Sequence, residues 1–155
     1  MQSMLIERTK GADGRSQLGA VTWEISRGGG VHLHWQFMPV PVDLIERGLV
    51  EAAFDVEAEN SSYPKFVKKI QDMEEAEEGD FLKVMIWSET LRKEMVLPLD
   101  KTFRFDLQFG RRVLGKLLGL QARTHWKDCT QTQAEEQADA DAFKEAFKAF
   151  DFSLE

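Results

Sequence analysis

The stretch from Gly28 to Val42 constrains the fold of this chain more than any other, because its residues alternate with the period of two that a strand requires. Its two faces are Val31, Leu33, Trp35 and Phe37 on one side, and His32, His34, Gln36 and Met38 on the other. Three glycines open the strand, and we expect Pro39 and Pro41 to end it, because a proline nitrogen cannot donate to a sheet ladder. The sequence therefore predicts a strand with two histidines and a glutamine in one row, near the middle of its sheet.

This polar row has a definite chemical meaning. His32, His34 and Gln36 would project at a spacing of roughly 6.5–7 Å. An imidazole can act as a nucleophile, an acid–base group or a phosphate partner near neutral pH. The alternative is that both histidines are ordinary strand residues, half-exposed or hydrogen-bonded in the core. A metal site is a weaker alternative, because no Cys, Asp or Glu stands at ligand spacing nearby.

Composition limits the classes of protein to which the chain can belong. A length of 155 residues fits one domain, or two small modules that share a core. No apolar run approaches the ~20 residues of a membrane span. A single cysteine, Cys129, allows no internal disulfide, which is typical of the reducing cytosol or nucleus.

Charge is distributed unevenly along the chain. The net charge of −7 argues against a protein that coats nucleic acid. Residues 101–127, however, carry seven basic side chains and one acidic side chain. Residues 128–155 carry eight acidic and two basic side chains. The chain is therefore acidic with one basic island, defined here as residues 101–127.

The remaining apolar periodicity predicts an α+β fold with a mostly antiparallel sheet and flanking helices, because the connections between strands are too short for parallel crossovers. Strands or extended segments are expected at residues 5–10, 21–25, 54–58, 81–87, 95–99 and 103–109. Helices are expected at residues 44–47, 63–73 and 111–120, and after a capping box formed by Thr132 and Glu135.

The last of these helices carries an apolar stripe: Ala142, Phe143, Ala146, Phe147 and Phe150. We expect this stripe to pack in the core, because three exposed phenylalanines would promote aggregation. The alternative is that it binds a partner protein.

Several motifs resemble one known family. The sequence HLHWQ (32–36), followed by PVPVDLI (39–45), is similar to the histidine motif of the histidine-triad (HIT) superfamily, and most similar to the HIT-like module of CwfJ-type proteins. Three later segments resemble the second C-terminal module of that family: LPLDKTFRFDLQFGRRVLGKLLGL (97–120), THWKDC (124–129) and AFKEAFKAFDFSLE (142–155). The resemblance implies a HIT-like fold, with residues 1–50 as a partial HIT-like module and residues 51–155 as the second module, packed as one unit. It identifies the chain as an N-terminally shortened member or a fragment.

The resemblance also implies a function. CwfJ-type proteins associate with the spliceosome and with the lariat-debranching enzyme, in the nucleus and secondarily in the cytoplasm. By this resemblance the chain is an accessory module that binds RNA phosphates, without a cofactor, a metal or a membrane. The candidate RNA-binding residues come from the basic island: Arg104, Arg111, Arg112, Lys116, Arg123, His125, Trp126 and Lys127.

An enzyme is the alternative function. In HIT-type nucleotidyl hydrolases and transferases a histidine attacks phosphorus, and the matching residue here is His34, with His32 before it and Gln36 after it. Glutamine can bind a phosphate oxygen but cannot shuttle a proton. Too little chain precedes the histidine strand to supply the usual base- and ribose-binding half, so the sequence favours binding over catalysis.

Overall fold

The computed structural model describes residues 5, 9–12, 14–28, 35–100, 104–151 and 153, apart from the side chain of Trp126. In chain order the elements are β1 (Leu18–Ser26), β2 (Trp35–Pro41), α2 (Val42–Glu46), α3 (Leu49–Asn60), α4 (Ile70–Ala76), β3 (Asp80–Trp87), β4 (Arg92–Leu99), α5 (Phe109–Leu117), the 3₁₀ turns η1 (Gln121–Arg123) and η2 (Trp126–Cys129), α6 (Gln133–Phe147) and η3 (Lys148–Phe150). Among these helices, none combines the length and the apolar character that crossing a membrane requires.

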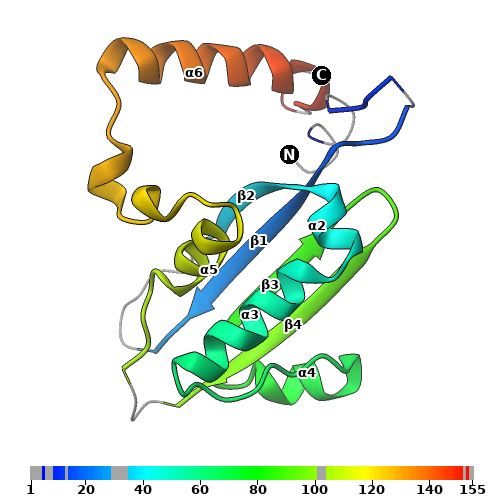
Figure 1. Ribbon diagram of the computed structural model, residues 1–155, viewed down its shortest axis with the longest axis vertical. Helices are drawn as coiled ribbons and strands as arrows, with labels where there is room; N and C mark the ends of the chain where they lie inside the picture. The colour runs from blue at the N-terminus through cyan, green and yellow to red at the C-terminus, as the bar shows by residue number, and fades with distance from the viewer. Residues whose placement is uncertain are drawn as a thin grey trace.

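Four strands form one sheet in the order β2-β1-β3-β4, and every neighbouring pair is antiparallel (Figure 1). The α+β class and the mostly antiparallel sheet are therefore confirmed. The strands predicted at 21–25, 81–87 and 95–99 are β1, β3 and β4. The division of the chain at residue 50 stays a prediction, and α3 runs across that position.

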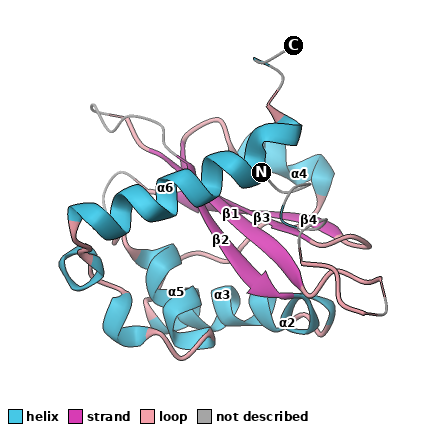
Figure 2. Ribbon diagram, turned by 90° about the horizontal axis from the view of Figure 1, so that it is seen from above, coloured by secondary structure: helices cyan, strands magenta, loops and turns pink. Residues whose placement is uncertain are grey.

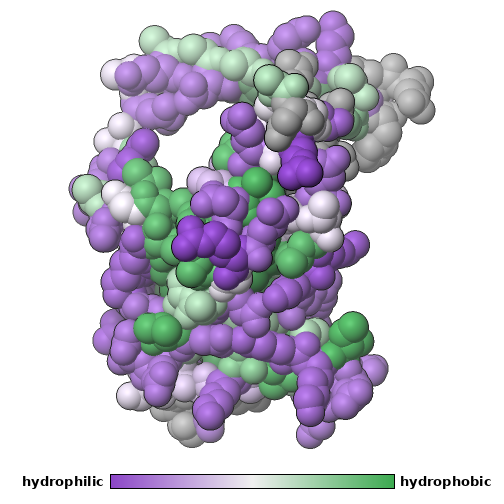
Figure 3. All heavy atoms as spheres, turned by 45° about the vertical axis from the view of Figure 1, so that its right-hand side comes forward, coloured by the Kyte–Doolittle hydropathy of each residue, from purple (hydrophilic) through white to green (hydrophobic). Residues whose placement is uncertain are grey.

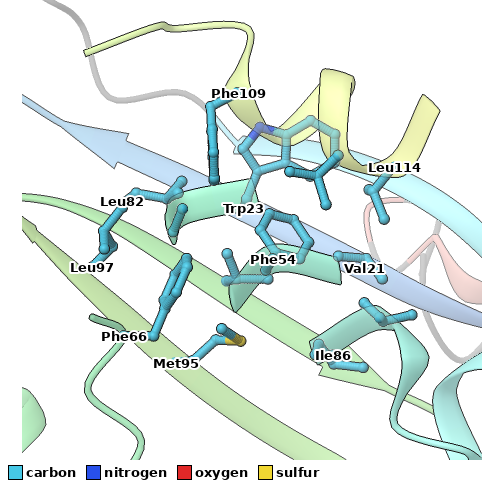
Figure 4. Close-up of a cluster of buried hydrophobic side chains, with 14 of the residues drawn as sticks. Val21, Trp23, Phe54, Phe66, Leu82, Ile86, Met95, Leu97, Phe109 and Leu114 are labelled. Atoms are coloured by element: carbon cyan, nitrogen blue, oxygen red, sulfur yellow. The ribbon is translucent and has the colours of Figure 1, made fainter. Parts of the chain in front are cut away.

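The main core lies between one face of the sheet and the helices α3 and α5, which Figure 2 shows on the same side. Trp23 of β1, Phe54 of α3 and Phe109 of α5 are almost completely buried, and Figure 4 shows their side chains gathered together. The rings of Phe54 and Phe109 lie 6.1 Å apart. Burial of large aromatic side chains of this kind stabilises a fold by about 1.5–3 kcal/mol each. This core positions α5, and with it the basic island, over the sheet.

Helix α4 covers the opposite face of the sheet (Figure 2). Met73 packs there with Phe81 of β3 and Val96 of β4. The residues before α4 are extended, and the backbone N–H of Val67 donates to the carbonyl oxygen of Val96 at 2.7 Å. A helix predicted to start at Tyr63 therefore starts only at Ile70, because the chain first pairs with β4.

The histidine strand corresponds to β2, and two expectations about it are wrong. In the described sheet β2 is an edge strand and not a central one. Pro39 lies inside β2 and does not end it, whereas Pro41 is its last residue, as expected. The N–H of Val42 donates to the carbonyl of Gln17, next to β1. Backbone nitrogens along a strand point alternately to its two sides, so those of Pro39 and Pro41 point away from β1. An edge strand tolerates proline at such positions, because no ladder bond is lost.

The strand predicted at residues 54–58 is also wrong, because these residues belong to α3. Val50, Phe54 and Ala58 are all buried, and their spacing of four residues places them on one face of a helix. The helical spacing of apolar residues over 49–60 therefore outweighs the strand-like alternation at 54–58. Gly48 precedes this helix with a φ of 71°, which ends α2 as expected.

The strand predicted at residues 103–109 is wrong within the described part, residues 104–109. Phe105 and Phe109 are buried, but they pack on the Tyr63 ring, at 5.1 and 5.3 Å, and not on a neighbouring strand. The N–H of Asp106 donates to the Tyr63 hydroxyl at 3.1 Å. The apolar residues of this alternation therefore belong to an aromatic cluster just before α5 and at its start, and not to a strand.

The expected burial of the stripe on the last helix is wrong as well. Helix α6 contains no buried residue, and Phe143 retains 43 % of its accessible surface. The capping box is confirmed: the N–H of Glu135 donates to Thr132 Oγ1, and the N–H of Thr132 donates to the Glu135 carboxylate. Figure 1 shows the reason for the exposure, because η1 and η2 carry the chain away from the sheet before α6 begins.

Candidate functional site

The described part of the histidine motif begins at Trp35; His32 and His34 lie outside the described residues. Gln36 shares a strand face with Met38 and Val40, and Val40 belongs to the core beneath the helices. Trp35 lies on the other face and retains 64 % of its accessible surface. Gln36, the described member of the predicted polar row, thus lies on the strand face towards the layer of α3 and α5, and Trp35 of the predicted apolar face is exposed.

A cavity of about 210 Å³ lies beside this strand face. Its lining comes from β2, from α5 and from the segment after α5: Met38, Arg111, Gly115, Leu120, Arg123, Thr124 and Cys129. Among the described residues that line it, none is acidic and two are arginines. Its volume is several times the ~30 Å³ share of one water molecule, so a phosphate group fits.

Arg111 is the half-buried side chain at the centre of this lining. Its Nη2 donates to the carbonyl oxygen of Arg123 at 3.2 Å and contacts Cys129 Sγ at 3.4 Å. Both acceptors are uncharged. Within the described residues Arg111 and Arg123 form no ion pair, so their charges are not neutralised by a carboxylate of this part of the chain.

Two glycines bring Arg123 back to Arg111. Gly119 adopts a φ of 69° after α5, a left-handed conformation that reverses the chain. The returning segment then packs against Gly115, where an added Cβ would lie 3.0 Å from Thr124 Oγ1. The absence of a side chain at Gly115 therefore allows the close approach that closes the cavity.

The next residues of the basic island form η2. His125 precedes this turn, and its Nδ1 accepts the backbone N–H of Lys127 at 3.2 Å. The Cys129 thiol donates to the carbonyl of Arg123 at 3.1 Å. The Trp126 side chain lies outside the described residues. His125 and Lys127 are exposed, and neither lines the cavity.

Arg112 and Lys116 have a different role. Lys116 Nζ donates to both oxygens of Glu57, at 2.8 and 2.9 Å, and Arg112 Nε donates to the same carboxylate at 3.1 Å. Arg112 also pairs with Asp106. The Lys116 ammonium and the Arg112 guanidinium hold the pKa of Glu57 below its usual range. These two predicted RNA contacts are therefore engaged in joining α5 to α3.

Arg104 lies apart from the cavity beside β2. It is exposed and lines a separate, open cavity with Tyr63 and Asp100. The structure thus brings together Arg111 and Arg123 in one cavity, and Arg104, Arg112 and Lys116 do not line it. Within the described ranges, no group of His, Cys, Asp and Glu side chains could hold a metal ion.

Sequence reasoning missed the acidic partner of the basic island and most of the apolar lining of the cavity. The sequence did contain one indication that an acidic partner exists. Arg112 and Lys116 are four residues apart and share a helix face, whereas Arg111 lies about 100° around the helix from Arg112. A single carboxylate can therefore neutralise Arg112 and Lys116 but not Arg111. No local signal identifies Glu57 as that carboxylate.

Comparison with known proteins finds one matching family and several similar proteins. The family described as "Protein similar to CwfJ C-terminus 2" matches residues 57–153. CWF19-like protein mug161 of Schizosaccharomyces pombe is 40% identical over 134 residues, which cover 86% of this chain and 22% of the relative. CWF19-like protein DRN1 of Saccharomyces cerevisiae is 27% identical over 150 residues, which cover 86% of this chain and 30% of the relative.

Zinc finger CCCH domain-containing protein 59 of Oryza sativa subsp. japonica is 30% identical over 125 residues, which cover 76% of this chain and 20% of the relative. The chain spans less than a third of the length of each of these three relatives. The resemblance read from the motifs is confirmed: the chain belongs to the CwfJ/CWF19-type family.

Proposed function

We propose that this chain is an RNA-binding accessory module of the splicing machinery, which binds an RNA phosphate in the cavity beside β2 through Arg111 and Arg123. The observation that carries the proposal is the pairing of two guanidinium groups that form no ion pair with the described residues, in a cavity whose described lining contains no acidic side chain. Membership of the CwfJ/CWF19-type family supports the RNA-processing context. That context implies a nuclear location, with spliceosomal proteins and the lariat-debranching enzyme as partners.

The chemistry of arginine supports a phosphate as the ligand. A guanidinium carries five N–H donors in a planar fork that matches phosphate oxygens and stays charged at every physiological pH. Arg111 uses one nitrogen, Nη2, on neutral acceptors, and these bonds fix the orientation of its fork. Preorganised donors lose less side-chain entropy when a ligand binds.

The position of the cavity links it to the histidine motif. Met38 lines the cavity, and Gln36 lies two residues further along the same strand face, at a rise of roughly 6.5–7 Å. A nucleic-acid backbone that places one phosphate between Arg111 and Arg123 would run towards this strand. A contact from His32 and His34, which lie outside the described residues, stays a prediction.

Binding of labelled single-stranded RNA to two double variants with the same change of charge tests the proposal. Arg111→Gln with Arg123→Gln removes the arginines of the cavity. Arg112→Gln with Lys116→Gln removes the charges engaged by Glu57. We expect the first variant to bind at least about tenfold more weakly, and its log–log salt dependence to become shallower by about 0.7, the slope for one neutralised phosphate of a single strand.

The second variant should bind RNA nearly as well as the wild type but unfold more easily. Equal loss of affinity in both variants would contradict the assignment, because binding would then follow net charge alone. A branched RNA beside its linear counterpart, with His32→Ala/His34→Ala as a further variant, tests whether the histidine motif reads the branch. Nucleotide release from a small dinucleotide that His34→Ala abolishes would instead establish the enzymatic alternative.

A further inference from the structure

Helix α6 presents an exposed face of unusual composition. It contains no buried residue, and Figure 3 shows open space beneath the left-hand part of this helix, at the top of the view. In the described structure its most extensive contacts with another element are with η3, directly after it in the chain. An isolated helix of 15 residues is only marginally stable in water. A binding partner would therefore add to its stability.

Three phenylalanines form a continuous aromatic surface at the C-terminal end of this helix. The rings of Phe143 and Phe147 are stacked at 5.7 Å, and those of Phe147 and Phe150 lie 6.5 Å apart. Phe143 is exposed and Phe147 and Phe150 are half-buried; aromatic side chains that reach the surface together mark sites of protein interaction. The burial of two or three phenylalanines would supply most of the affinity for a protein segment.

Acidic side chains continue the same stripe towards the N-terminus of α6. Glu136 and Asp139 lie seven and four residues before Phe143, which is two turns and about one turn back on the same helix face. Over Gln133–Phe147 the helix carries five acidic residues and one lysine. Within the described residues Glu136 forms no ion pair, whereas Asp139 accepts the side-chain amide of Gln131.

We propose that this stripe, defined as Glu136, Asp139, Phe143, Phe147 and Phe150, docks a basic amphipathic helix of a partner protein. Charge complementarity selects the occupant: RNA is repelled by Glu136 and Asp139, and a second copy of the chain would bring two acidic helices together. The stripe is also directional. Glu136 at its acidic end lies about 10 Å along the helix axis from Phe143, the first of its phenylalanines, which is the rise of seven helical residues. The partner helix therefore carries basic residues and apolar residues on the same face, about two turns apart along its axis. The proposal does not depend on RNA binding by Arg111 and Arg123.

The test uses a fluorescently labelled synthetic helix with lysines on two turns and leucines on the next two turns of one face. A peptide of the same composition in scrambled order is the control probe. Two variants change the stripe: Phe143→Gln/Phe147→Gln removes the rings, and Glu136→Gln/Asp139→Asn removes the charges. Glu74→Gln/Glu75→Gln is the control, because it makes the same charge change at two exposed residues of α4, away from α6. Glutamine is a good helix former, so circular dichroism should report an intact helix.

We expect the ordered peptide to bind the wild type more tightly than the scrambled one, and both stripe variants to lose about tenfold in affinity while the control variant does not. The affinity that the acidic pair supplies should decline as salt rises. Equal binding of the two peptides, or equal loss in the stripe and control variants, would overturn the proposal. So would sedimentation showing a wild-type dimer that the phenylalanine variant lacks, because the occupant would then be a second copy.

Discussion

Lys116 of α5 donates to both carboxylate oxygens of Glu57 on α3, at 2.8 and 2.9 Å, across 59 residues of sequence. Arg112 reaches the same carboxylate, whose side chain keeps only 11 % of its accessible surface. The three groups hold the two helices of the main core layer together. Their engagement also explains why only part of the basic island is available to a ligand.

Glu57→Gln should lower the free energy of unfolding by about 1–3 kcal/mol, because it leaves Lys116 without its described partner and Arg112 with Asp106 alone. The loss stays below that of a fully buried pair, since Lys116 is half-exposed. Urea unfolding measures it. Glu51→Gln on the same helix is the matched control, because Glu51 also pairs with two cations, Lys68 and Lys93, but is itself more exposed than Glu57, and its loss should cost under about 1 kcal/mol. Equal losses in the two variants would mean that burial of Glu57 contributes nothing.

Stability should also depend on acid pH through the same carboxylates. The pKa of Glu57 is lowered by Lys116 and Arg112, and that of Glu51 by Lys68 and Lys93, both from an ordinary value of 4.5. Between the folded and unfolded pKa values the unfolded chain binds more protons, so stability rises with pH in that window. The stabilisation is therefore fully present above about 4.5 and is lost as pH falls through the lowered folded values.

Urea unfolding at several pH values below neutrality measures this dependence. Glu57→Gln should flatten it, because the variant no longer has that titrating group. A slope unchanged by the substitution would assign the acid sensitivity to other carboxylates.

The N-terminal turn of α5 depends on a close approach to Trp23. A Cβ added to Gly110 would lie 2.6 Å from Trp23 Nε1, and this nitrogen is buried without a hydrogen-bond partner in the described structure. Gly110→Ala should therefore lower the free energy of unfolding by about 1–3 kcal/mol, although alanine has the better helix propensity by about 1 kcal/mol.

The measurement is thermal or urea unfolding followed by tryptophan fluorescence. Gly79→Ala is the control, because an added Cβ at Gly79 meets nothing within 4 Å, and this variant should stay within about 0.5 kcal/mol of the wild type. A neutral Gly110→Ala would mean that α5 can shift away from the sheet at little cost.

The sequence permitted much of the sheet to be predicted, because β1, β3 and β4 each contain an alternation or a buried apolar run, at residues 21–25, 81–87 and 95–99. It could not place β2 in the sheet, since periodicity describes the faces of a strand and not its neighbours. The outward nitrogens of Pro39 and Pro41 become meaningful only once β2 is known to be an edge.

The candidate site was predicted in composition but not in arrangement. Arg111, Arg112, Lys116 and Arg123 were all identified as one basic group, yet Glu57 lies 55 residues from Arg112 in sequence. Ion pairs between residues far apart in sequence leave no local pattern. Counting the basic residues of the island therefore overestimated how many are available to a ligand. In the same way, the stripe on α6 indicates which helix face is apolar but not what covers it.

The start of α6 offers a test of how far this helix is independent of the body. Thr132→Ala removes the hydroxyl that accepts the N–H of Glu135 and donates to the Glu135 carboxylate at 2.7 Å. Loss of such a cap costs about 1 kcal/mol of helix stability. Because α6 has no buried residue, that cost should appear as fraying of the helix and not as a lower free energy of unfolding for the sheet.

Hydrogen exchange distinguishes these two effects. Amides of α6 should exchange faster in Thr132→Ala, while those of β1 and β3 keep their wild-type protection. Thr130→Ala is the matched control, since its hydroxyl donates to the carbonyl of Lys127 and lies before the helix. Reduced protection of β1 in Thr132→Ala alone would show that α6 is coupled to the sheet. If binding of the basic peptide then restores the protection of α6, the partner supplies the stabilisation that the body of this chain does not.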